Sequence, residues 1–254
     1  MKTAIVIPAR LASSRLPAKP LLMETGKYLV QHVYEQACQA RADTVLVATD
    51  DPCIYRAVRG FGGQATMTRS DHVSGTDRVA EAAANLDADI IVNLQGDEPL
   101  IEPSALDLLS DLLKSHADGD MATLATPITC LQQWRDPNCV KVVRDGAGKA
   151  MYFSRSPIPF VREGAPDLSA GQQIFLQHLG LYAYRREFLL RIAQLPRCPL
   201  EHVEKLEQLR MLGAGCSIQV GIVDHAARGV DTPADYQQFV ETYFRQRQSA
   251  NVAA

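Results

Sequence analysis

The sequence lacks any hydrophobic run of about 18 residues, the length that a membrane-spanning helix needs. The apolar stretch near the N-terminus covers only residues 4–7 before Pro8 and Arg10, which is too short for the core of a secretory signal. A basic excess is also missing: 26 Lys and Arg against 29 Asp and Glu give a net charge of −3, which argues against broad nucleic-acid binding. We therefore expect a cytoplasmic protein that binds neither membranes nor nucleic acids.

Closely spaced cysteines are absent as well. The six cysteines are at least nine positions apart, so the sequence contains no C-x-x-C pattern of a zinc or redox site. Without a secretory segment, a disulfide framework is not expected. We expect free thiols on small side chains that are buried or half-buried. These residues are Cys38, Cys53, Cys130, Cys139, Cys198 and Cys216.

The overall composition is that of an ordinary globular protein, but cations are concentrated near the N-terminus. The 254 residues are 46% hydrophobic and 22% charged, which excludes intrinsic disorder and a coiled coil. No internal repeat or low-complexity segment occurs. Against the acidic total, the first 27 residues hold five cations and a single carboxylate, Glu24. The cations are Lys2, Arg10, Arg15, Lys19 and Lys27.

Strand-like and helical patterns alternate through the first half of the chain. Continuous apolar strands separated by helices predict an α/β fold, with a mostly parallel sheet sandwiched between helices. Ser104 is the expected N-cap of the last helix in this half. The expected strands cover residues 3–7, 44–48, 89–94 and 121–126, and the expected helices cover 28–38, 53–61, 76–86 and 104–115.

The second half predicts a smaller β-rich subregion and two more helices. We expect a single domain over residues 1–247, divided near residue 130, followed by a flexible tail over 248–254. The stretch from 157 to 171 is an expected excursion from the sheet. The expected strands cover residues 140–144, 150–153, 179–184 and 217–223, and the expected helices cover 200–212 and 234–246.

The loop after the first expected strand is a candidate phosphate-binding site. Ligands of α/β sheets bind at the carboxyl ends of the strands, and the loop over residues 8–20 occupies that place. It carries Arg10, Arg15 and Lys19, the hydroxyl pair Ser13-Ser14 and three prolines. Fixed cations and exposed backbone N–H groups suit a polyphosphate. The segment matches neither G-x-G-x-x-G nor a P-loop, and a solvated basic loop is the alternative.

Two acidic residues are candidate ligands of a divalent cation. Asp97 follows an apolar strand, so its carboxylate would face the same crevice as the basic loop and could hold Mg²⁺ against a triphosphate. Asp231 lies in a second polar segment, Gly229 to Pro233. The alternatives are local: Asp97 is also a common turn residue, and Asp231 before Thr-Pro is also a good helix start.

The segment over residues 68–78 is rich in hydroxyl groups and could bind a base and a ribose. Arg69, Ser74 and the backbone around Gly75 suit the carbonyl and amine of a pyrimidine. The alternative is a helix N-terminus capped by Ser74 or Thr76, and both interpretations can hold together.

These segments together resemble a known family of enzymes. Residues 7–21, IPARLASSRLPAKPL, are similar to the nucleotide-binding motif of sugar nucleotidyltransferases, in particular the cytidylyltransferases that activate 3-deoxy-D-manno-octulosonate (KDO). Further segments agree in the same order and extend the resemblance over almost the whole chain. They read MTRSDHVSGTDR, VNLQGDEP, YFSRSPIPF, HLGLYAY, LEHVEKLEQLR and GVDTPADY.

The resemblance implies that CTP and KDO react to give CMP-KDO and pyrophosphate for lipopolysaccharide biosynthesis, with Mg²⁺ as cofactor. It implies a homodimer formed through the β-rich subregion, and cytosine selection within 68–78. Asp77 stands where many relatives have Glu, so the reach of that carboxylate is open. The implied catalytic residues are Arg10, Lys19, Asp97 and Asp231, the last two as metal ligands. The implied CTP-binding residues are Pro8, Ala9, Arg10, Arg15, Lys19, Arg69, Ser74, Gly75 and Gln95.

The acceptor is a sugar acid, so its site needs a cation for the carboxylate and polar groups for several hydroxyls. His178 and Tyr182 are four residues apart on an expected strand, so they share one face. Each acceptor candidate also has a structural alternative, as a surface charge, a core residue or a solvated helix face. The candidates are Gln95, Arg155, His178, Tyr182, Glu207 and Gln208.

Three other functions remain open from the sequence. The acceptor could be another sugar acid, such as sialic acid or an amino-KDO. A glycosyltransferase that uses a nucleotide sugar usually shows D-x-D after the corresponding strand, whereas Asp87-Ala88-Asp89 precedes it. A nucleotide sensor without catalysis would not need both Asp97 and Asp231.

Overall fold

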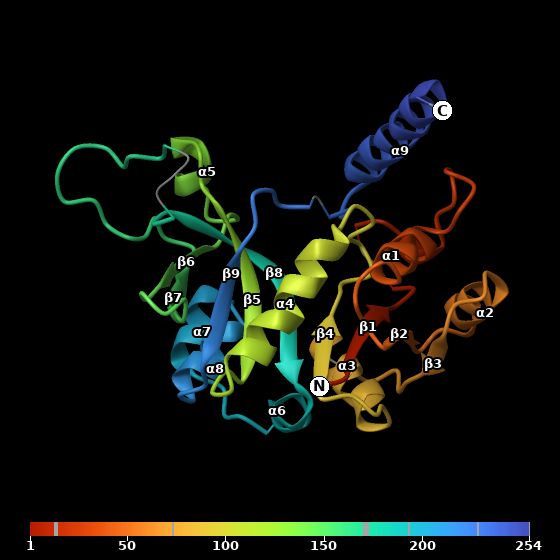
Figure 1. Ribbon diagram of the computed structural model, residues 1–254, viewed down its shortest axis with the longest axis horizontal. Helices are drawn as coiled ribbons and strands as arrows, with labels where there is room; N and C mark the ends of the chain where they lie inside the picture. The colour runs from red at the N-terminus through yellow and green to blue at the C-terminus, as the bar shows by residue number, and fades with distance from the viewer. Residues whose placement is uncertain (13–14, 73, 170–172, 193, 228, 254) are drawn as a thin grey trace. The chain divides into compact units, whose positions relative to one another are not determined.

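The chain folds into two compact units, which are described separately (Figure 1). The computed structural model describes residues 1–12, 15–72, 74–169, 173–192, 194–227 and 229–253. Ser13 and Ser14, part of the candidate phosphate loop, lie outside the described residues. The first unit contains residues 2–87, 93–106 and 227–254, and the second unit contains residues 1, 88–92 and 107–226.

The first unit is built on three parallel strands. Strand β1 (Thr3–Ala9) pairs with β2 (Thr44–Thr49), and β2 pairs with β3 (Ala65–Met67). Every residue of β1 is buried, which explains its continuous apolar sequence. The strand extends two residues beyond the expected end, because Pro8 and Ala9 still align with β2. The basic loop therefore starts at Arg10, directly at the carboxyl edge of the sheet.

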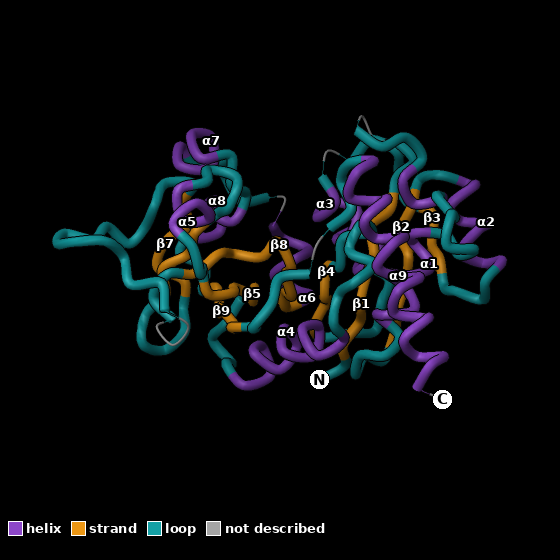
Figure 2. The backbone as a smooth tube through the Cα atoms, turned by 90° about the horizontal axis from the view of Figure 1, so that it is seen from above, coloured by secondary structure: helices purple, strands orange, loops and turns teal. Residues whose placement is uncertain are grey.

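Helices cover both faces of these strands. Helices α1 (Leu29–Ala37) and α2 (Pro52–Gly60) follow β1 and β2 in the chain, and α3 (Gly75–Ala84) lies on the opposite side (Figure 2). Helix α2 begins where it does because the carboxylate of Asp51 accepts hydrogen bonds from two backbone N–H groups of its first turn. The long helix α9 (Pro233–Ala253) completes this unit.

One hydrophobic cluster of the first unit fixes parts of the candidate site. Leu16 of the basic loop and Val230, which precedes Asp231, are buried against α1 and α9. Burying both side chains against the same helices holds the loop and the Asp231 segment at fixed positions. The buried members of the cluster are Leu16, Leu29, Val230, Tyr236, Phe239 and Val240.

The second unit contains the antiparallel part of the fold. Its strand order is β4 (Ile90–Asn93), β8 (Leu176–Arg185), β5 (Met121–Pro127) and β9 (Ile218–Ile222). Strand β8 runs antiparallel to β5, whereas β9 runs parallel to it. The hairpin of β6 (Lys141–Arg144) and β7 (Ala150–Ser154) joins the other edge of β8 near its start.

The helices of the second unit show where local sequence was misleading. The expected helix over 200–212 is wrong: α7 (Pro199–Glu204) and α8 (Gln208–Gly213) are separate, because Lys205 adopts a left-handed conformation with φ 54°. Helix α4 (Pro103–Ser115), whose residues 103–106 belong to the first unit, begins at its proline, so Ser104 is inside the helix and is not its N-cap. Short helices α5 (Leu131–Arg135) and α6 (Arg186–Ile192) complete the unit.

The predicted fold class is confirmed: the protein has a mostly parallel sheet flanked by helices, together with a smaller antiparallel subregion. Short elements that the sequence pattern missed are β3, α5, α6 and the 3₁₀ turn η1 (Lys19–Leu21). The expected tail from residue 248 continues α9 as far as Ala253. None of the helices in the described ranges is both long and apolar enough to cross a membrane.

The six cysteines are free, as expected, but their burial differs from the expectation. Cys38, Cys53 and Cys130 are exposed, and only Cys139 is buried. The expectation is wrong for the three exposed thiols because they lie at helix ends, where the chain reaches solvent.

His32 is a buried histidine of the first unit. Its Nε2 atom lies 2.6 Å from the hydroxyl of Thr25, and its ring packs edge-on against Phe239 and Tyr243. Burial lowers the pKa of His32 to about 4, with Glu35 opposing the shift and Lys27 adding to it. Between pH 6.5 and 4 the unfolded chain therefore binds a proton that the folded ring does not accept.

We expect the stability that His32 contributes to be fully present above about pH 6.5 and to be lost as the pH falls towards 4. Unfolding free energies of the wild type and of His32→Asn should be measured across this range. The advantage of the wild type should shrink by about 3 kcal/mol, since one pKa unit is worth about 1.4 kcal/mol. A difference between the two proteins that stays constant with pH would contradict the buried, neutral ring.

Candidate active site

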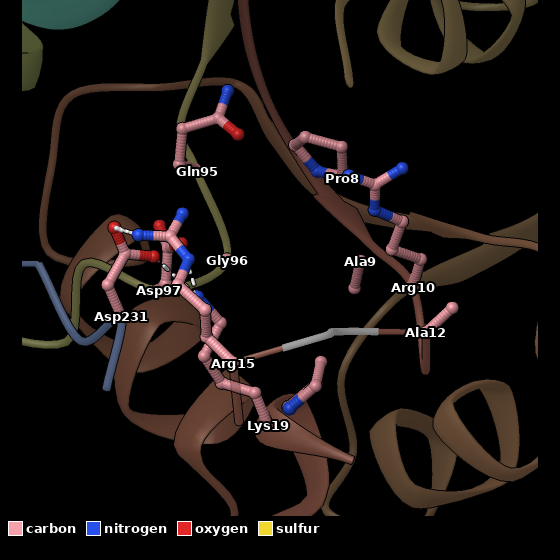
Figure 3. Close-up of a pocket in the computed structure, with 11 residues that line it drawn as sticks. Pro8, Ala9, Arg10, Ala12, Arg15, Lys19, Gln95, Gly96, Asp97 and Asp231 are labelled. Atoms are coloured by element: carbon pink, nitrogen blue, oxygen red, sulfur yellow. Dashed lines mark hydrogen bonds and ion pairs between the residues drawn. The ribbon is translucent and has the colours of Figure 1, made fainter. Parts of the chain in front are cut away.

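Most of the candidate nucleotide residues of the first unit line one cavity of about 650 Å³ (Figure 3), whereas Arg69, Ser74 and Gly75 do not line it. This volume is typical of a site for a small molecule. The walls are polar and come from the end of β1, the basic loop, the turn after β4 and the segment before α9. The lining residues are Pro8, Ala9, Arg10, Ala12, Arg15, Lys19, Pro20, Gln95, Gly96, Asp97 and Asp231.

Lys19 is the centre of the hydrogen-bond network in this cavity. Its Nζ lies 2.7 Å from Oδ2 of Asp97 and 3.2 Å from Oδ1 of Asp231, and it donates to the carbonyl of Val230 at 2.9 Å. The Lys19 side chain is only 13% exposed, so its bond to Asp97 is weakly screened, whereas the bond to Asp231, whose side chain is 51% exposed, is screened by water. One ammonium group thus joins three segments that lie far apart in the sequence.

The backbone before Lys19 is bent so that its side chain can enter the cavity. Ala18 has φ 52°, a left-handed conformation that is unfavourable for a residue with a side chain, and it begins the 3₁₀ turn at Lys19. Leu16 and Pro20 on either side are buried. The packing of these two residues offsets the unfavourable conformation and fixes the direction of Lys19.

The other two cations of the loop remain accessible. Arg15 pairs with Asp231 at 3.3 Å, but its side chain is 67% exposed, so this surface ion pair adds little stability. Arg10 lines the cavity and is exposed. Both guanidinium groups can therefore turn towards an anionic ligand at small energetic cost.

The segment that contains Asp231 is a helix start, as the alternative from the sequence expected, but Asp231 itself is not the N-cap of α9. The N-terminus of α9 is capped by Thr232 and Asp235, whose backbone and side-chain groups bond reciprocally. The carboxylate of Asp231 points instead towards Arg15 and Lys19 (Figure 3). Asp97 is tied to the same segment, since its carbonyl accepts a 2.8 Å hydrogen bond from the N–H of Val230.

Close backbone approach around Gly96 brings the turn after β4 onto the end of β1. A Cβ atom on Gly96 would lie 3.0 Å from the carbonyl oxygen of Pro8, so any larger residue would push the two segments apart. A Cβ atom on Gly75 would lie 3.5 Å from Gln95 Oε1 and 3.5 Å from Pro8. The N-terminus of α3 therefore lies beside the predicted phosphate and carboxylate segments.

Glu98 adds a third carboxyl group next to the pair. Burial raises its pKa to about 7, and the charges of Asp97 and Asp231 raise it further in the same direction. Glu98 was not among the predicted site residues, since the proline after it gave no indication of where its side chain points. Within the described residues, no group of three or more His, Cys, Asp or Glu is arranged to hold a metal ion.

The predicted base-binding segment has the cap that the sequence suggested. The Ser74 hydroxyl accepts a hydrogen bond from the N–H of Asp77 and so caps α3. Asp77, although shorter than Glu, still reaches Ser74, because its carboxylate accepts the hydroxyl proton at 2.9 Å. The side chain of Arg69 is exposed and pairs with Asp71.

Two residues that the sequence analysis did not identify hold this segment in place. The carboxylate of Glu81 accepts from the backbone N–H of Arg69 and contacts Nε2 of His72. Arg78 is 4% exposed, forms an ion pair with Asp50 and donates to Thr68. Both residues lie on α3, at positions that a helical pattern alone would assign to an ordinary helix surface.

The acceptor candidates other than Gln95 lie in the second unit. The rings of His178 and Tyr182 are 5.5 Å apart, which confirms that they share a face of β8. Burial lowers the pKa of His178 to about 3, so its ring is neutral, and Nε2 lies 3.0 Å from the hydroxyl of Thr123. Burial also raises the pKa of Tyr182 well above its usual value, and the charge of Glu207 adds to the shift.

Arg155, Glu207 and Gln208 lie on neighbouring elements of the same unit. Arg155 directly follows β7, Glu207 is the N-cap of α8, and Gln208 is its buried first residue. Helix α8 packs against β7. Glu207 also lines a second cavity, of about 600 Å³, together with residues of α7.

Comparison with known proteins defines the class of enzyme. Residues 4–218 match the family model described as cytidylyltransferase. A relative from Syntrophotalea carbinolica is 51% identical over 96% of this chain and 99% of its own length, and one from Syntrophobacter fumaroxidans is 50% identical over 94% and 96%. Both relatives are named 3-deoxy-manno-octulosonate cytidylyltransferase.

A solved structure agrees with these relatives over the entire fold. It is a CMP:2-keto-3-deoxy-manno-octonic acid synthetase in complex with CTP, with a TM-score of 0.90, 45% identity and coverage of 97% of this chain and 100% of the other. The chain belongs to the cytidylyltransferase family, among the 3-deoxy-manno-octulosonate cytidylyltransferases.

We expect Gly96→Ala to weaken nucleotide binding by about tenfold, because 3.0 Å is too short for a methyl group beside the Pro8 carbonyl. The change would separate Asp97 from the end of β1. Calorimetric titration with CTP would measure the loss.

Gly60→Ala is the matched control, since a Cβ atom on Gly60 meets nothing within 4 Å. The control should bind CTP as the wild type does. Unchanged CTP affinity in folded Gly96→Ala would refute the need for close approach.

Proposed function

We propose that the chain transfers CMP from CTP to the anomeric hydroxyl of KDO, which yields CMP-KDO and pyrophosphate. The observation that carries the proposal is the Lys19 network. It places an ammonium, two carboxylates and the cations of one loop around a single cavity. The names of the relatives and of the solved structure support KDO and CTP as the substrates.

In this reaction the C2 oxygen of KDO attacks the α-phosphorus, and the bond from that phosphorus to pyrophosphate breaks. Arg10, Arg15 and Lys19 would neutralise the negative charge that moves onto the leaving pyrophosphate. Phosphoryl transfer depends mainly on such positioning and charge stabilisation. No side chain is assigned as the general base.

The residues present fit a divalent cation. Asp97 and Asp231 both direct a carboxylate oxygen at the ammonium group of Lys19, so they already offer hard oxygen ligands to one positive charge. We propose that these two residues hold Mg²⁺ together with phosphate oxygens of CTP. When bound, Mg²⁺ would withdraw charge from the α-phosphate and orient the reactants.

The remaining site residues divide between the two substrates. We propose that Pro8, Ala9 and Gln95 line the nucleotide site and that Arg69, Ser74 and Gly75 select cytosine. A carboxylate of the acceptor would pair with Arg155. The buried neutral His178 and the protonated Tyr182 would offer hydrogen bonds to sugar hydroxyls. Gln95, Glu207 and Gln208 would complete the acceptor set.

We propose that the two units of the chain bind different substrates. The nucleotide would be bound mainly by the first unit, which includes Asp231 although that residue lies in the second half of the sequence. The acceptor would be bound mainly by the second unit. KDO activation would serve lipopolysaccharide biosynthesis, in the cytoplasm where CTP is made.

We propose that the protein is a homodimer and that the antiparallel subregion of the second unit forms its interface. Phe160, Met151 and Ile174 there are 85%, 63% and 50% exposed. Large apolar side chains that are exposed within one subregion favour a protein interface there. Sedimentation equilibrium should give about twice the chain mass, and Phe160→Glu should shift the species towards the monomer. A monomer at all working concentrations of the wild type would contradict the dimer.

The reaction itself can be tested by measuring pyrophosphate release with each of the four nucleoside triphosphates, Mg²⁺ and KDO. We expect release with CTP and much less with ATP, GTP and UTP. Sialic acid in place of KDO tests the acceptor. Folded protein that releases no pyrophosphate with CTP and KDO would refute the proposed function, and faster release with sialic acid would change the acceptor.

The variant Asp97→Asn, measured in the same pyrophosphate assay, separates an effect on catalysis from an effect on folding. The amide keeps the shape of the side chain and removes the charge, so turnover should fall by about 100-fold or more in a protein that still folds, although loss of the ion pair with Lys19 lowers its melting temperature. Asp118→Asn is the matched control, since Asp118 is an exposed carboxylate that pairs with Lys149. The control should keep wild-type turnover.

A further inference from the structure

Glu204, the last residue of α7, forms a second polar network outside the nucleotide cavity. Its Oε1 accepts a 2.6 Å hydrogen bond from the hydroxyl of Ser154, and its Oε2 accepts a 2.9 Å bond from the backbone N–H of Arg155. Ser154 is 2% exposed, so one of these bonds is shielded from water. In the sequence this residue falls within the expected helix over 200–212.

The same residue also fixes the Arg155 side chain. The backbone carbonyl of Glu204 accepts from Nε of Arg155 at 2.8 Å, and the carbonyl of Pro137 accepts from Nη1 at 2.9 Å. Within the described part of the chain, Nη2 of Arg155 has no hydrogen-bond partner. The guanidinium is therefore locked on one edge and can offer the other nitrogen to a ligand.

Lys141 donates a hydrogen bond to the backbone carbonyl oxygen of Arg155. Its side chain is fully buried, and its ammonium donates to the carbonyls of Arg155, Asp136 and Cys139 at 2.7, 2.8 and 2.7 Å. Three carbonyl acceptors satisfy all three protons of the ammonium group. The N–H, the carbonyl and two side-chain nitrogens of Arg155 are thus all held by the protein.

Glu204 couples this arginine to the other acceptor candidates. Helix α7 ends at Glu204 because Lys205 turns left-handed, and Glu207 and Gln208 follow at the start of α8. The Glu204 carboxylate therefore ties the end of β7 to the turn that carries Glu207. Arg155 and Glu207 come from segments about 50 residues apart, and a single carboxylate bridges the chain between them.

We propose that Glu204 is a positioning residue for the sugar-acid acceptor, which it orients through Arg155 without touching the substrate itself. The proposal rests on the proposed function, because it takes Arg155 as the partner of the acceptor carboxylate. A guanidinium that is locked before binding loses little conformational freedom when the carboxylate arrives. The contribution of Glu204 therefore falls on the acceptor and not on CTP.

The test compares the kinetic constants of Glu204→Gln with those of the wild type. The amide replaces one of the two acceptor oxygens with an NH2 donor, so it cannot accept at both the Ser154 and the Arg155 positions, and the KM for KDO should rise by about tenfold or more. The KM for CTP should stay within about twofold. Glu204→Asp, which keeps the charge, should recover part of the loss.

Glu201→Gln is the matched control on the same helix. Glu201 forms an ion pair with Arg210 of α8 and makes no hydrogen bond to Arg155, so its loss disturbs the packing of α7 against α8 without removing a bond to Arg155. An equal rise of the KM for KDO in Glu201→Gln, or an equal rise for both substrates in Glu204→Gln, would overturn the proposal. So would an unchanged KM for KDO in folded Glu204→Gln.

A double variant tests whether Glu204 acts through Arg155. The KM for KDO of Glu204→Gln with Arg155→Ala should be no higher than that of Arg155→Ala alone, whereas additive effects would refute the coupling.

If Glu204→Gln does not fold, Ser154→Ala removes one of the two bonds and should raise the KM for KDO by about threefold. Wild-type turnover with KDO is measured first, so failure of the proposed function is seen separately; the same comparisons then use the acceptor that the wild type accepts.

Discussion

The first unit depends on one ammonium group. Lys19 reaches the carboxylates of Asp97 and Asp231 and the carbonyl of Val230, so its position fixes three segments of the candidate active site together. The hydrophobic cluster that buries Leu16 and Val230 sets the distances between these segments. Electrostatic attraction alone could be satisfied in many arrangements, whereas burial of two side chains against α1 and α9 selects one.

Charge in this protein is organised locally and not over the whole surface. The chain has a net charge of −3, yet the loop after β1 gathers Arg10, Arg15 and Lys19 at one sheet edge. The second unit instead presents uncharged polar groups, since burial keeps His178 neutral and Tyr182 protonated. A triphosphate needs cations that are free to meet it, and a sugar with many hydroxyls needs neutral donors and acceptors in fixed positions.

Much of the candidate site follows from local sequence, because local rules fix its parts. The loop after β1 is placed by the end of a buried strand, the Ser74 cap by helix-terminus chemistry, and the shared face of His178 and Tyr182 by the two-residue repeat of a strand. The position of the Arg155 side chain is less local. Its guanidinium is held by the carbonyls of Pro137 and Glu204, and no spacing rule connects those positions.

The sequence by itself determined the α/β class, the place of the basic loop after β1 and the family, since these depend on periodicity and on motifs that are continuous in the chain. The tertiary structure decided which distant groups meet. Asp231 lies in the first unit, and Thr232 caps α9 in its place. The expected helix over 200–212 is interrupted at Lys205. Glu204 accepts a hydrogen bond from Arg155. The physical reason is that packing and hydrogen-bond satisfaction are settled between segments far apart in sequence, where local propensity carries no information.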